Sequence, residues 1–191
     1  MNILQKTSNF FLAARRTRKE RTTKDMKRLS FEEIFDADQF EDLTAAYFNL
    51  LHNEHNAVKE IQVDQSGKGI DGGVDVSIKI KVNDGLINFN RVWIIQCKFY
   101  EGPVSPSKLA TINIPSLVHS HNAVGYLLVC KNGVTSGVTD LFKNLNRDCQ
   151  FGYAYKIWKG DEFLKRIRYH QSLLESYFPE FWVAYQKLKD Q

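Results

Sequence analysis

The chain has 191 residues, of which 43% are hydrophobic and 25% charged, and its formal net charge is +4. This length suits one well-packed domain with one or two additional elements. The composition is that of an ordinary globular protein and excludes a largely disordered chain, which would be poorer in aliphatic and aromatic residues. No apolar run approaches the length of a transmembrane helix, so no membrane association is expected.

Residues 1–28 form a basic leader that we expect to be flexible. The leader holds nine Lys and Arg residues against two acidic ones, a net charge of +7; because the whole chain carries +4, the remainder carries −3. A basic arm of this kind can bind a phosphate backbone and release its counterions. A solvated extension without a ligand is an equal alternative.

The cysteines indicate a cytoplasmic protein. The cysteines are odd in number and lack the spacing of metal ligands, which is typical of reduced thiols; they are Cys97, Cys130 and Cys149. The apolar stretch at residues 9–14 is too short for a signal peptide, and its positive charge follows it instead of preceding it.

The expected elements change in type along the chain. A helix over residues 39–51, which Asp36 or Asp38 can cap, comes before three strands at 57–63, 74–82 and 91–100. Helices at 106–117, 134–145, 161–169 and 173–188 then alternate with strands at 123–130 and 152–158. Pro115 should distort or end the first of these helices, and Pro179 should break or restart the last. This order predicts an α/β fold, with a mixed central sheet, an antiparallel meander first, and helices on both sides.

Three polar side chains are expected to meet at the end of the hairpin formed by residues 74–82 and 91–100. Gln96 and Lys98 are two residues apart and project from one face of their strand, while Cys97 points to the other. Asp75 lies near the beginning of the neighbouring strand, and antiparallel pairing can place it beside them. A carboxylate, an amide oxygen and an ammonium group would then converge.

This grouping suits phosphodiester hydrolysis. Asp75 and the side-chain oxygen of Gln96 are hard ligands of the kind that Mg²⁺ prefers, and the main-chain carbonyl of Cys97 could supply a third. The metal would polarise the phosphoryl group and help to generate hydroxide from water, and Mn²⁺ could substitute for Mg²⁺. Lys98 could orient that water, lower its pKa, or offset charge on the transition state. These three roles stay open.

Paired motifs give the chain a family resemblance. Residues 71–76 (Asp-Gly-Gly-Val-Asp-Val) are followed about twenty residues later by residues 96–100 (Gln-Cys-Lys-Phe-Tyr). With this pair the chain resembles the Mrr-like branch of the PD-(D/E)XK nucleases, in which glutamine commonly replaces the acidic residue of the terminal triplet. Phe40-Glu41 and the segments 102–105 and 158–164 are also similar to that branch, and the resemblance covers about residues 38–168.

The resemblance implies a restriction-endonuclease-like fold and cleavage of double-stranded DNA. It also implies that Asp75 and Gln96 bind metal, that Lys98 is catalytic, and that Glu41 supports the metal site indirectly. A structural alternative stays open for Glu41, because the helix dipole favours an acidic residue in the first turn in any case.

Lys68, Asp71 and Lys79 are the candidates for further contacts to DNA. Lys68 lies in a glycine-rich segment that lacks the spacing of a nucleotide-binding loop. Asp71 stands in a turn where backbone geometry alone favours aspartate, so the turn role is the stronger interpretation and a DNA-facing role the alternative. For Lys79 a simply solvated side chain is the alternative. The pairs His52/His55 and His119/His121 lack a third ligand, so no zinc site is expected.

These observations predict a Mg²⁺-dependent endodeoxyribonuclease in residues 29–170 that serves defence against foreign DNA. Cutting both strands requires two active sites, so we expect a homodimer or a higher oligomer. Residues 171–191 are expected to form a helical extension, either a dimerisation helix or a linker to a C-terminal sensor or NTP-binding module. Two alternatives stay open: a DNA-binding module that no longer cuts, and a junction-resolvase-like nuclease that selects branched DNA.

Overall fold

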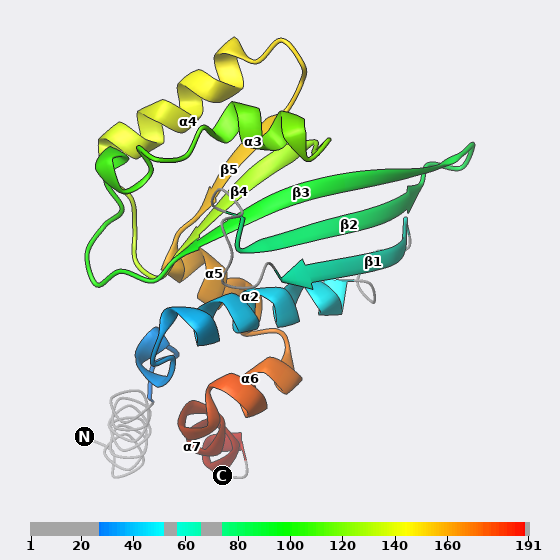
Figure 1. The fold of residues 1–191 in the computed structure, drawn as a ribbon. Helices are drawn as coiled ribbons and strands as arrows, with labels where there is room; N and C mark the ends of the chain where they lie inside the picture. Colours follow the sequence, from blue (N-terminus) through cyan, green and yellow to red (C-terminus); the bar gives the residue numbers. More distant parts are fainter. Residues whose placement is uncertain (1–26, 52–56, 66–73, 190–191) are drawn as a thin grey trace, which may run out of the picture.

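A five-stranded sheet with the strand order β1-β2-β3-β4-β5 forms the centre of the molecule (Figure 1). The computed structural model describes residues 27–51, 57–65 and 74–189. The strands are β1 (Val58–Gln65), β2 (Val76–Asn83), β3 (Asn88–Lys98), β4 (Gly125–Cys130) and β5 (Ala154–Trp158). β1, β2 and β3 pair antiparallel, whereas β3, β4 and β5 pair parallel. The mixed sheet and its antiparallel meander are confirmed.

Helices cover both faces of this sheet, as predicted. They are α2 (Ala37–Leu50), α3 (Ile114–Ser120), α4 (Ser136–Asp148), α5 (Gly160–Ile167), α6 (Gln171–Tyr177) and α7 (Pro179–Lys189). α3 and α4 lie on one face, α2 and α5 lie on the other, and α6 and α7 pack beyond α2 (Figure 1). Every residue of β4 is buried, as expected for a strand that is covered on both faces.

Two separate apolar cores result from this layering. The larger core lies between the sheet and α2, and it includes Phe40, Ile95 and Cys97 together with Phe178, between α6 and α7, and Phe181 of α7. The smaller core lies between the sheet and the α3–α4 layer and is built around Tyr126 and Phe142. The sheet therefore separates the side chains of β3 into two environments, and alternation along the strand decides which environment each side chain enters.

α2 begins where its polar residues provide a cap. The Asp36 side chain accepts a hydrogen bond from the Gln39 N–H at 2.8 Å, which satisfies one of the free donors of the first turn. Phe40, Leu43 and Tyr47 then form the buried stripe against the sheet. The helix predicted for residues 39–51 is confirmed, with a beginning two residues earlier.

The prediction of one helix over residues 106–117 was wrong. A short 3₁₀ turn covers Pro106–Lys108, and α3 begins only at Ile114, where the Asn113 side chain accepts from the Ser116 N–H at 3.1 Å. Pro115 therefore stands in the first turn of a helix, where its missing N–H breaks no hydrogen bond, and it does not end one. Pro179 likewise opens α7, as one of the two expected outcomes at that residue.

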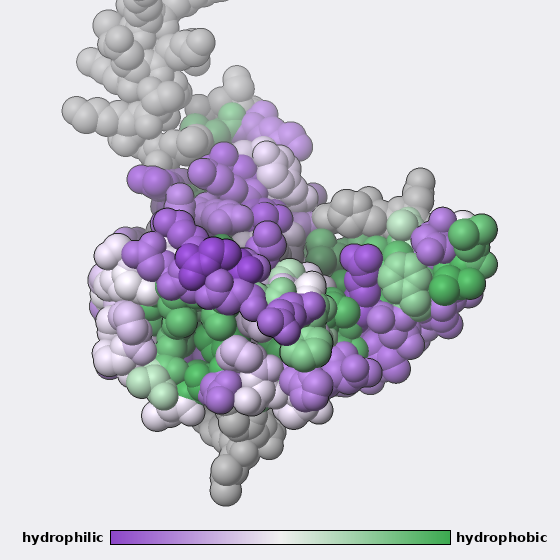
Figure 2. Space-filling view, turned by 90° about the horizontal axis from the view of Figure 1, so that it is seen from above, coloured by the Kyte–Doolittle hydropathy of each residue, from purple (hydrophilic) through white to green (hydrophobic). Residues whose placement is uncertain are grey.

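The β2–β3 hairpin projects beyond the rest of the sheet (Figure 1). Its turn is held by its own polar groups, because the Asp84 side chain accepts from the N–H groups of Leu86 and Ile87 at 2.9 and 3.0 Å. Gly85 has a φ of 95°, a conformation that favours glycine. Leu86 and Ile87 are exposed, and Figure 2 shows the apolar patch at this end of the molecule.

Several sequence predictions fall on segments outside the described residues. These are the leader up to residue 26, the pair His52/His55, and the turn that contains Lys68 and Asp71. Across residues 27–51, 57–65 and 74–189, no helix combines the length and apolar character needed to cross a membrane.

Gly160 is a position where the fold accepts no side chain. Its N–H donates to the Asn132 carbonyl at 2.8 Å, and a Cβ atom there would lie 1.8 Å from the Lys131 carbonyl oxygen. We predict that Gly160→Ala lowers the free energy of unfolding by roughly 3 kcal/mol or more, because the obstacle is backbone. Chemical denaturation measures this change. Gly133→Ala is the matched control, since nothing lies within 4 Å of its Cβ position; equal losses in the two variants would contradict the prediction.

Candidate active site

Asp75 is fixed where β2 begins, beside the end of β3. Its N–H donates to the Ile95 carbonyl at 3.1 Å, and its Oδ2 accepts from the Cys97 N–H at 2.6 Å. Regular pairing of the two strands begins one residue later, with Val76 opposite Ile95. The carboxylate thus takes the place of a main-chain acceptor, so the backbone of β3 determines its position.

The irregular pairing at Asp75 corrects one expectation. Strict alternation predicts that Val74 shares a face with Val76 and Ile78. Val76 and Ile78 lie in the core under α2, but Val74 packs in the core under α3 and α4. The alternation ends at Val76 because the chain leaves the regular strand at Asp75.

Gln96 is almost completely buried, with 1% of its surface exposed. Its Oε1 accepts a hydrogen bond from the Tyr126 hydroxyl at 2.5 Å. The two side chains are diagonal neighbours, because the parallel register pairs Ile94 with Tyr126 and Gln96 with Leu128. A carbonyl oxygen has two lone pairs, so one remains available for a second partner.

Tyr126 is the residue of this site that the sequence prediction did not include. The strand at 123–130 was predicted only as a buried apolar run. A tyrosine within such a run is itself a signal, since a buried hydroxyl requires a hydrogen-bond partner. Burial raises the pKa of Tyr126 well above its usual range, and the charge of Asp75 raises it further, so the phenol stays a donor.

Cys97 contributes its backbone to the site and its side chain to the opposite face. The thiol lies in the core under α2, as the alternation along β3 predicts, and burial raises its pKa far above the usual range. The N–H and C=O of one strand residue point toward the same neighbouring strand. The Cys97 carbonyl therefore points toward the same side as the N–H that binds Asp75.

Glu41 comes to this end of β3 from α2. Thr44, one turn along the same helix, hydrogen-bonds the Cys97 thiol, and the charge of Glu41 acts on the pKa of that thiol. The helix thus brings Glu41 to the strand end on the α2 side, while Gln96 and Tyr126 lie on the side of α3 and α4.

The electrostatics of the site are those of a carboxylate without an adequate counter-charge. Burial raises the pKa of Asp75, and the Cys97 N–H and the charge of Lys98 only partly oppose this shift. Lys98 has no ion pair with any residue in the part of the chain that the structure describes. A half-buried anion in this condition is stabilised by a cation.

The oxygen atoms around Asp75 fit a hard divalent metal. Within the described ranges, no group of three or more His, Cys, Asp or Glu side chains could hold a metal ion. The donors at hand are one carboxylate, the Gln96 amide oxygen and the Cys97 carbonyl. Such a set suits Mg²⁺, which needs few protein oxygens and keeps several waters, and it does not suit zinc, which prefers nitrogen and sulfur.

Lys79 lies outside this group. It is exposed on β2, where it lies opposite Val92 of β3 and Gln62 of β1. It stands four residues after Asp75 along the strand, away from the end where Asp75 lies. Among the described residues the structure thus brings Asp75, Gln96, Lys98 and Glu41 to one strand end, and Lys79 stays apart as a surface lysine on the hairpin.

A family match now bears on this geometry. The Mrr_cat model, described as restriction endonuclease, matches residues 33–167. The chain belongs to this restriction endonuclease family. The matched range contains Glu41, Asp75, Gln96 and Lys98, and it confirms the resemblance drawn from the paired motifs.

Two solved structures are similar to this family member. The MspJI restriction endonuclease in complex with a 27-mer oligonucleotide is 18% identical, with 72% of this chain and 32% of that chain covered and a TM-score of 0.48. The DNA modification-dependent restriction endonuclease AspBHI is 13% identical, with 81% and 42% covered and a TM-score of 0.49. This chain thus spans less than half the length of either protein. No curated protein matches it.

The raised pKa of Asp75 predicts a variant that is more stable than the wild type. The folded state favours the neutral carboxyl of Asp75, because its pKa is raised there. Below the pKa of the unfolded state the carboxyl is neutral in both states and does not lower the free energy of unfolding. As the pH rises through the raised folded pKa, the carboxyl ionises in the folded protein and the free energy of unfolding falls. Asp75→Asn should therefore have a higher Tm than wild type at pH 7 in EDTA, and this difference should vanish near pH 3. For a chain of this length, each kcal/mol gained in the free energy of unfolding raises the Tm by roughly 2–4 °C. Scanning calorimetry at both pH values measures it.

Asp84 supplies a control of opposite sign. Hydrogen bonds from the N–H groups of Ile87 and Leu86 lower the pKa of its carboxyl. Its ionised form stabilises the fold above the unfolded pKa, so Asp84→Asn should be less stable than wild type at pH 7. A loss of stability in Asp75→Asn at pH 7 would instead mean that the charge of Lys98 outweighs burial.

Proposed function

We propose that this chain is a Mg²⁺-dependent endonuclease domain that hydrolyses phosphodiester bonds of double-stranded DNA. The observation that carries the proposal is the attachment of the Asp75 carboxylate to the backbone of β3, beside Gln96 and Lys98. Membership of the restriction endonuclease family supports the nuclease class of the reaction.

The proposed metal ligands are the Asp75 carboxylate, the Gln96 Oε1 and the main-chain carbonyl of Cys97. When bound, the metal polarises the phosphoryl group and lowers the pKa of a coordinated water. Burial makes Asp75 a favourable ligand, because a nearby cation removes the cost of its desolvated charge. Glu41 supports the site from α2 without direct coordination.

Lys98 is proposed as the catalytic cation. No described residue forms an ion pair with it, so its ammonium group is free to meet the substrate. It can orient the attacking water or offset the charge that develops on the pentacovalent phosphorus. Both roles require the ammonium group, so removal of the side chain tests them together.

Tyr126 is proposed as a positioning residue for Gln96. Its hydroxyl donates to the Gln96 Oε1, and this hydrogen bond would hold the amide oxygen, with its second lone pair available, toward a bound metal. The buried side chains around this pair allow little rearrangement, because both residues are at most 1% exposed.

The biological setting is part of the same proposal. Cleavage of both strands needs two active sites, so the active form would be a homodimer or a larger assembly in the cytoplasm. We infer that it acts in defence against foreign DNA. Residues 171–191 stay a proposed linker or dimerisation helix; Leu173 of α6, Phe181 of α7 and Phe178 between the two helices lie in the core under α2.

The first prediction of this function concerns Lys98. Wild-type protein should nick or linearise plasmid DNA with Mg²⁺ and not with EDTA, and Lys98→Ala should reduce the rate about 100-fold or more, because it removes stabilisation of the transition state. Gel electrophoresis of the plasmid measures cleavage. Lys143→Ala, which removes an exposed lysine of α4, should cut at the wild-type rate.

Two results would count against this assignment. Equal cleavage by wild type and Lys98→Ala would mean that the site is misassigned or that a contaminant cuts. Binding of DNA without cleavage by wild type, with or without Mg²⁺, would favour the DNA-binding module, and selective cutting of branched DNA would favour the resolvase-like alternative.

A second prediction concerns Tyr126. Tyr126→Phe should raise the Mg²⁺ concentration for half-maximal cleavage, or lower activity, by about 10–100-fold, because a residue that orients a metal ligand is lost. Titration of cleavage with Mg²⁺ measures this effect. Tyr155→Phe is the matched control, since Tyr155 is the register partner of Tyr126 on β5 and its hydroxyl does not contact Gln96. The same Mg²⁺ dependence in both variants would remove Tyr126 from the site.

A further inference from the structure

A cleft of about 890 Å³ lies at the carboxyl ends of β3, β4 and β5. Three of its lining residues follow these parallel strands in turn: Glu101 after β3, Lys131 after β4 and Gly160 after β5. Residues 27–32 line it as well. The carboxyl ends of parallel strands are where sheets of this kind bind ligands.

The cleft is joined directly to the strand that carries Lys98. The Lys131 N–H donates to the Lys98 carbonyl at 3.0 Å. The Asn132 side chain donates to the carbonyls of Tyr100 and Glu101, both at 2.8 Å. The wall of the cleft therefore holds the segment that follows Lys98, so a ligand in the cleft would lie next to the candidate active site.

The cleft is electropositive, because three of its lining cations form no ion pair with a residue that the structure describes. Lys131 pairs with Glu101, and Lys165 lies 3.9 Å from Asp161, so these four lining charges offset one another. Arg28, Lys159 and Arg168 also line the cleft, and none forms an ion pair with a residue that the structure describes. Glu32 is the one lining carboxylate that remains to oppose these three cations.

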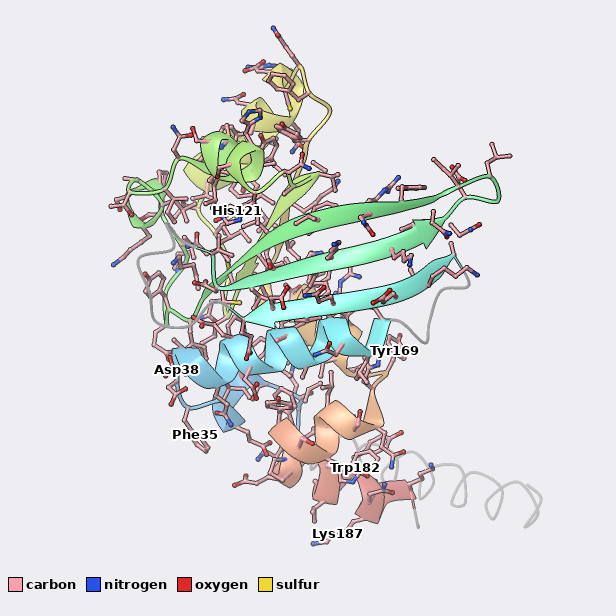
Figure 3. The ribbon with its side chains drawn as sticks, turned by 45° about the vertical axis from the view of Figure 1, so that its right-hand side comes forward. Phe35, Asp38, His121, Tyr169, Trp182 and Lys187 are labelled. Carbon is pink, nitrogen blue, oxygen red and sulfur yellow. The ribbon has the colours of Figure 1, made fainter. Side chains whose placement is uncertain are left out.

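The cationic surface extends past this cleft. Arg28 and Arg168 also line a second cavity of about 550 Å³, which continues toward α7 and includes Trp182 and Lys189. Tyr169, another lining residue, and Trp182 are labelled in Figure 3, near the C-terminal helices. Four residues line both cavities, namely Lys27, Arg28, Leu29 and Arg168, so the cavities adjoin, and we refer to the two together as the groove. Cations shared by two adjoining cavities can meet successive phosphates of a chain, whereas one compact anion would occupy a single cavity.

We propose that this groove binds the phosphodiester backbone of the DNA duplex beside the cleavage site, with Arg28 and Arg168 as phosphate contacts. The planar guanidinium group offers several N–H donors that match the oxygens of a phosphate. The proposal rests on the proposed nuclease function and adds to it the surface that holds the substrate outside the catalytic residues.

The test is a salt titration of DNA binding. A short fluorescein-labelled duplex is titrated with protein in EDTA, so that no cleavage occurs, and the Kd is measured by anisotropy at several KCl concentrations. Each phosphate contact adds about 0.9 to the slope of log Kd against log salt, so Arg28→Ala/Arg168→Ala should reduce the slope by about 1.8. Both side chains are exposed and have no ion pair with a described residue, so the Tm should stay that of wild type.

Lys143→Ala/Lys187→Ala is the control with the same loss of charge. Lys143 lies on α4, and Lys187, labelled in Figure 3, lies on α7; neither lines the groove. This variant should keep a slope of log Kd against log salt close to that of wild type, because it removes two positive charges that do not lie in the groove. Equal slopes in the two double variants would overturn the proposal, even where wild type binds and cuts DNA normally.

Two further outcomes are decisive. Binding of a fluorescent ATP analogue that Arg168→Ala abolishes, with DNA binding unchanged, would identify the cleft as a nucleotide site and overturn the proposal. Failure of wild-type protein to bind duplex DNA at any salt concentration would instead overturn both this proposal and the nuclease function on which it rests.

Discussion

The hydrogen bond from the Cys97 N–H to the Asp75 carboxylate is the contact on which the candidate site depends. It joins the beginning of β2 to the end of β3 at the point where regular strand pairing stops. A main-chain donor cannot change rotamer, so the position of the carboxylate follows the backbone of β3. Gln96 and Lys98 flank that donor in sequence and take their positions from the same strand. The proposed metal ligands are therefore positioned by the backbone of the sheet.

This arrangement lowers the free energy of unfolding, and the unfavourable groups lie at the candidate site. Asp75 is half-buried, and its partial burial raises its pKa although the charge of Lys98 opposes this shift; Gln96 is a buried polar side chain whose oxygen depends on Tyr126. A domain selected for stability alone would place apolar residues here. Unfavourable burial of polar groups at one strand end, within a sheet whose other buried side chains are mostly apolar, is typical of a functional site.

The direction of the strands places the other features of the molecule. Because β3, β4 and β5 are parallel, the segments after them meet at one edge, and this edge carries both Lys98 and the basic cleft. Gly160 allows the segments after β4 and β5 to approach closely there. The antiparallel half of the sheet contributes Asp75 at the same edge and extends the hairpin away from it. Catalysis and substrate binding are thus proposed at one edge of the sheet.

The sequence by itself determined the type and order of most elements, the mixed sheet with helices on both sides, and the central grouping of the candidate site. Alternation along residues 91–100 separates Gln96 and Lys98 from Cys97, and the paired motifs at their spacing identify Asp75, because both signals are local and periodic. The tertiary structure alone decided the rest. Tyr126 meets Gln96 across a strand register that no local pattern specifies, Val74 changes sides because pairing stops at Asp75, and Pro115 begins a helix because Asn113 caps it. The cleft that holds Arg28 and Arg168 joins residues far apart in the chain, and such a contact exists only once the sheet and α5 bring the two segments together.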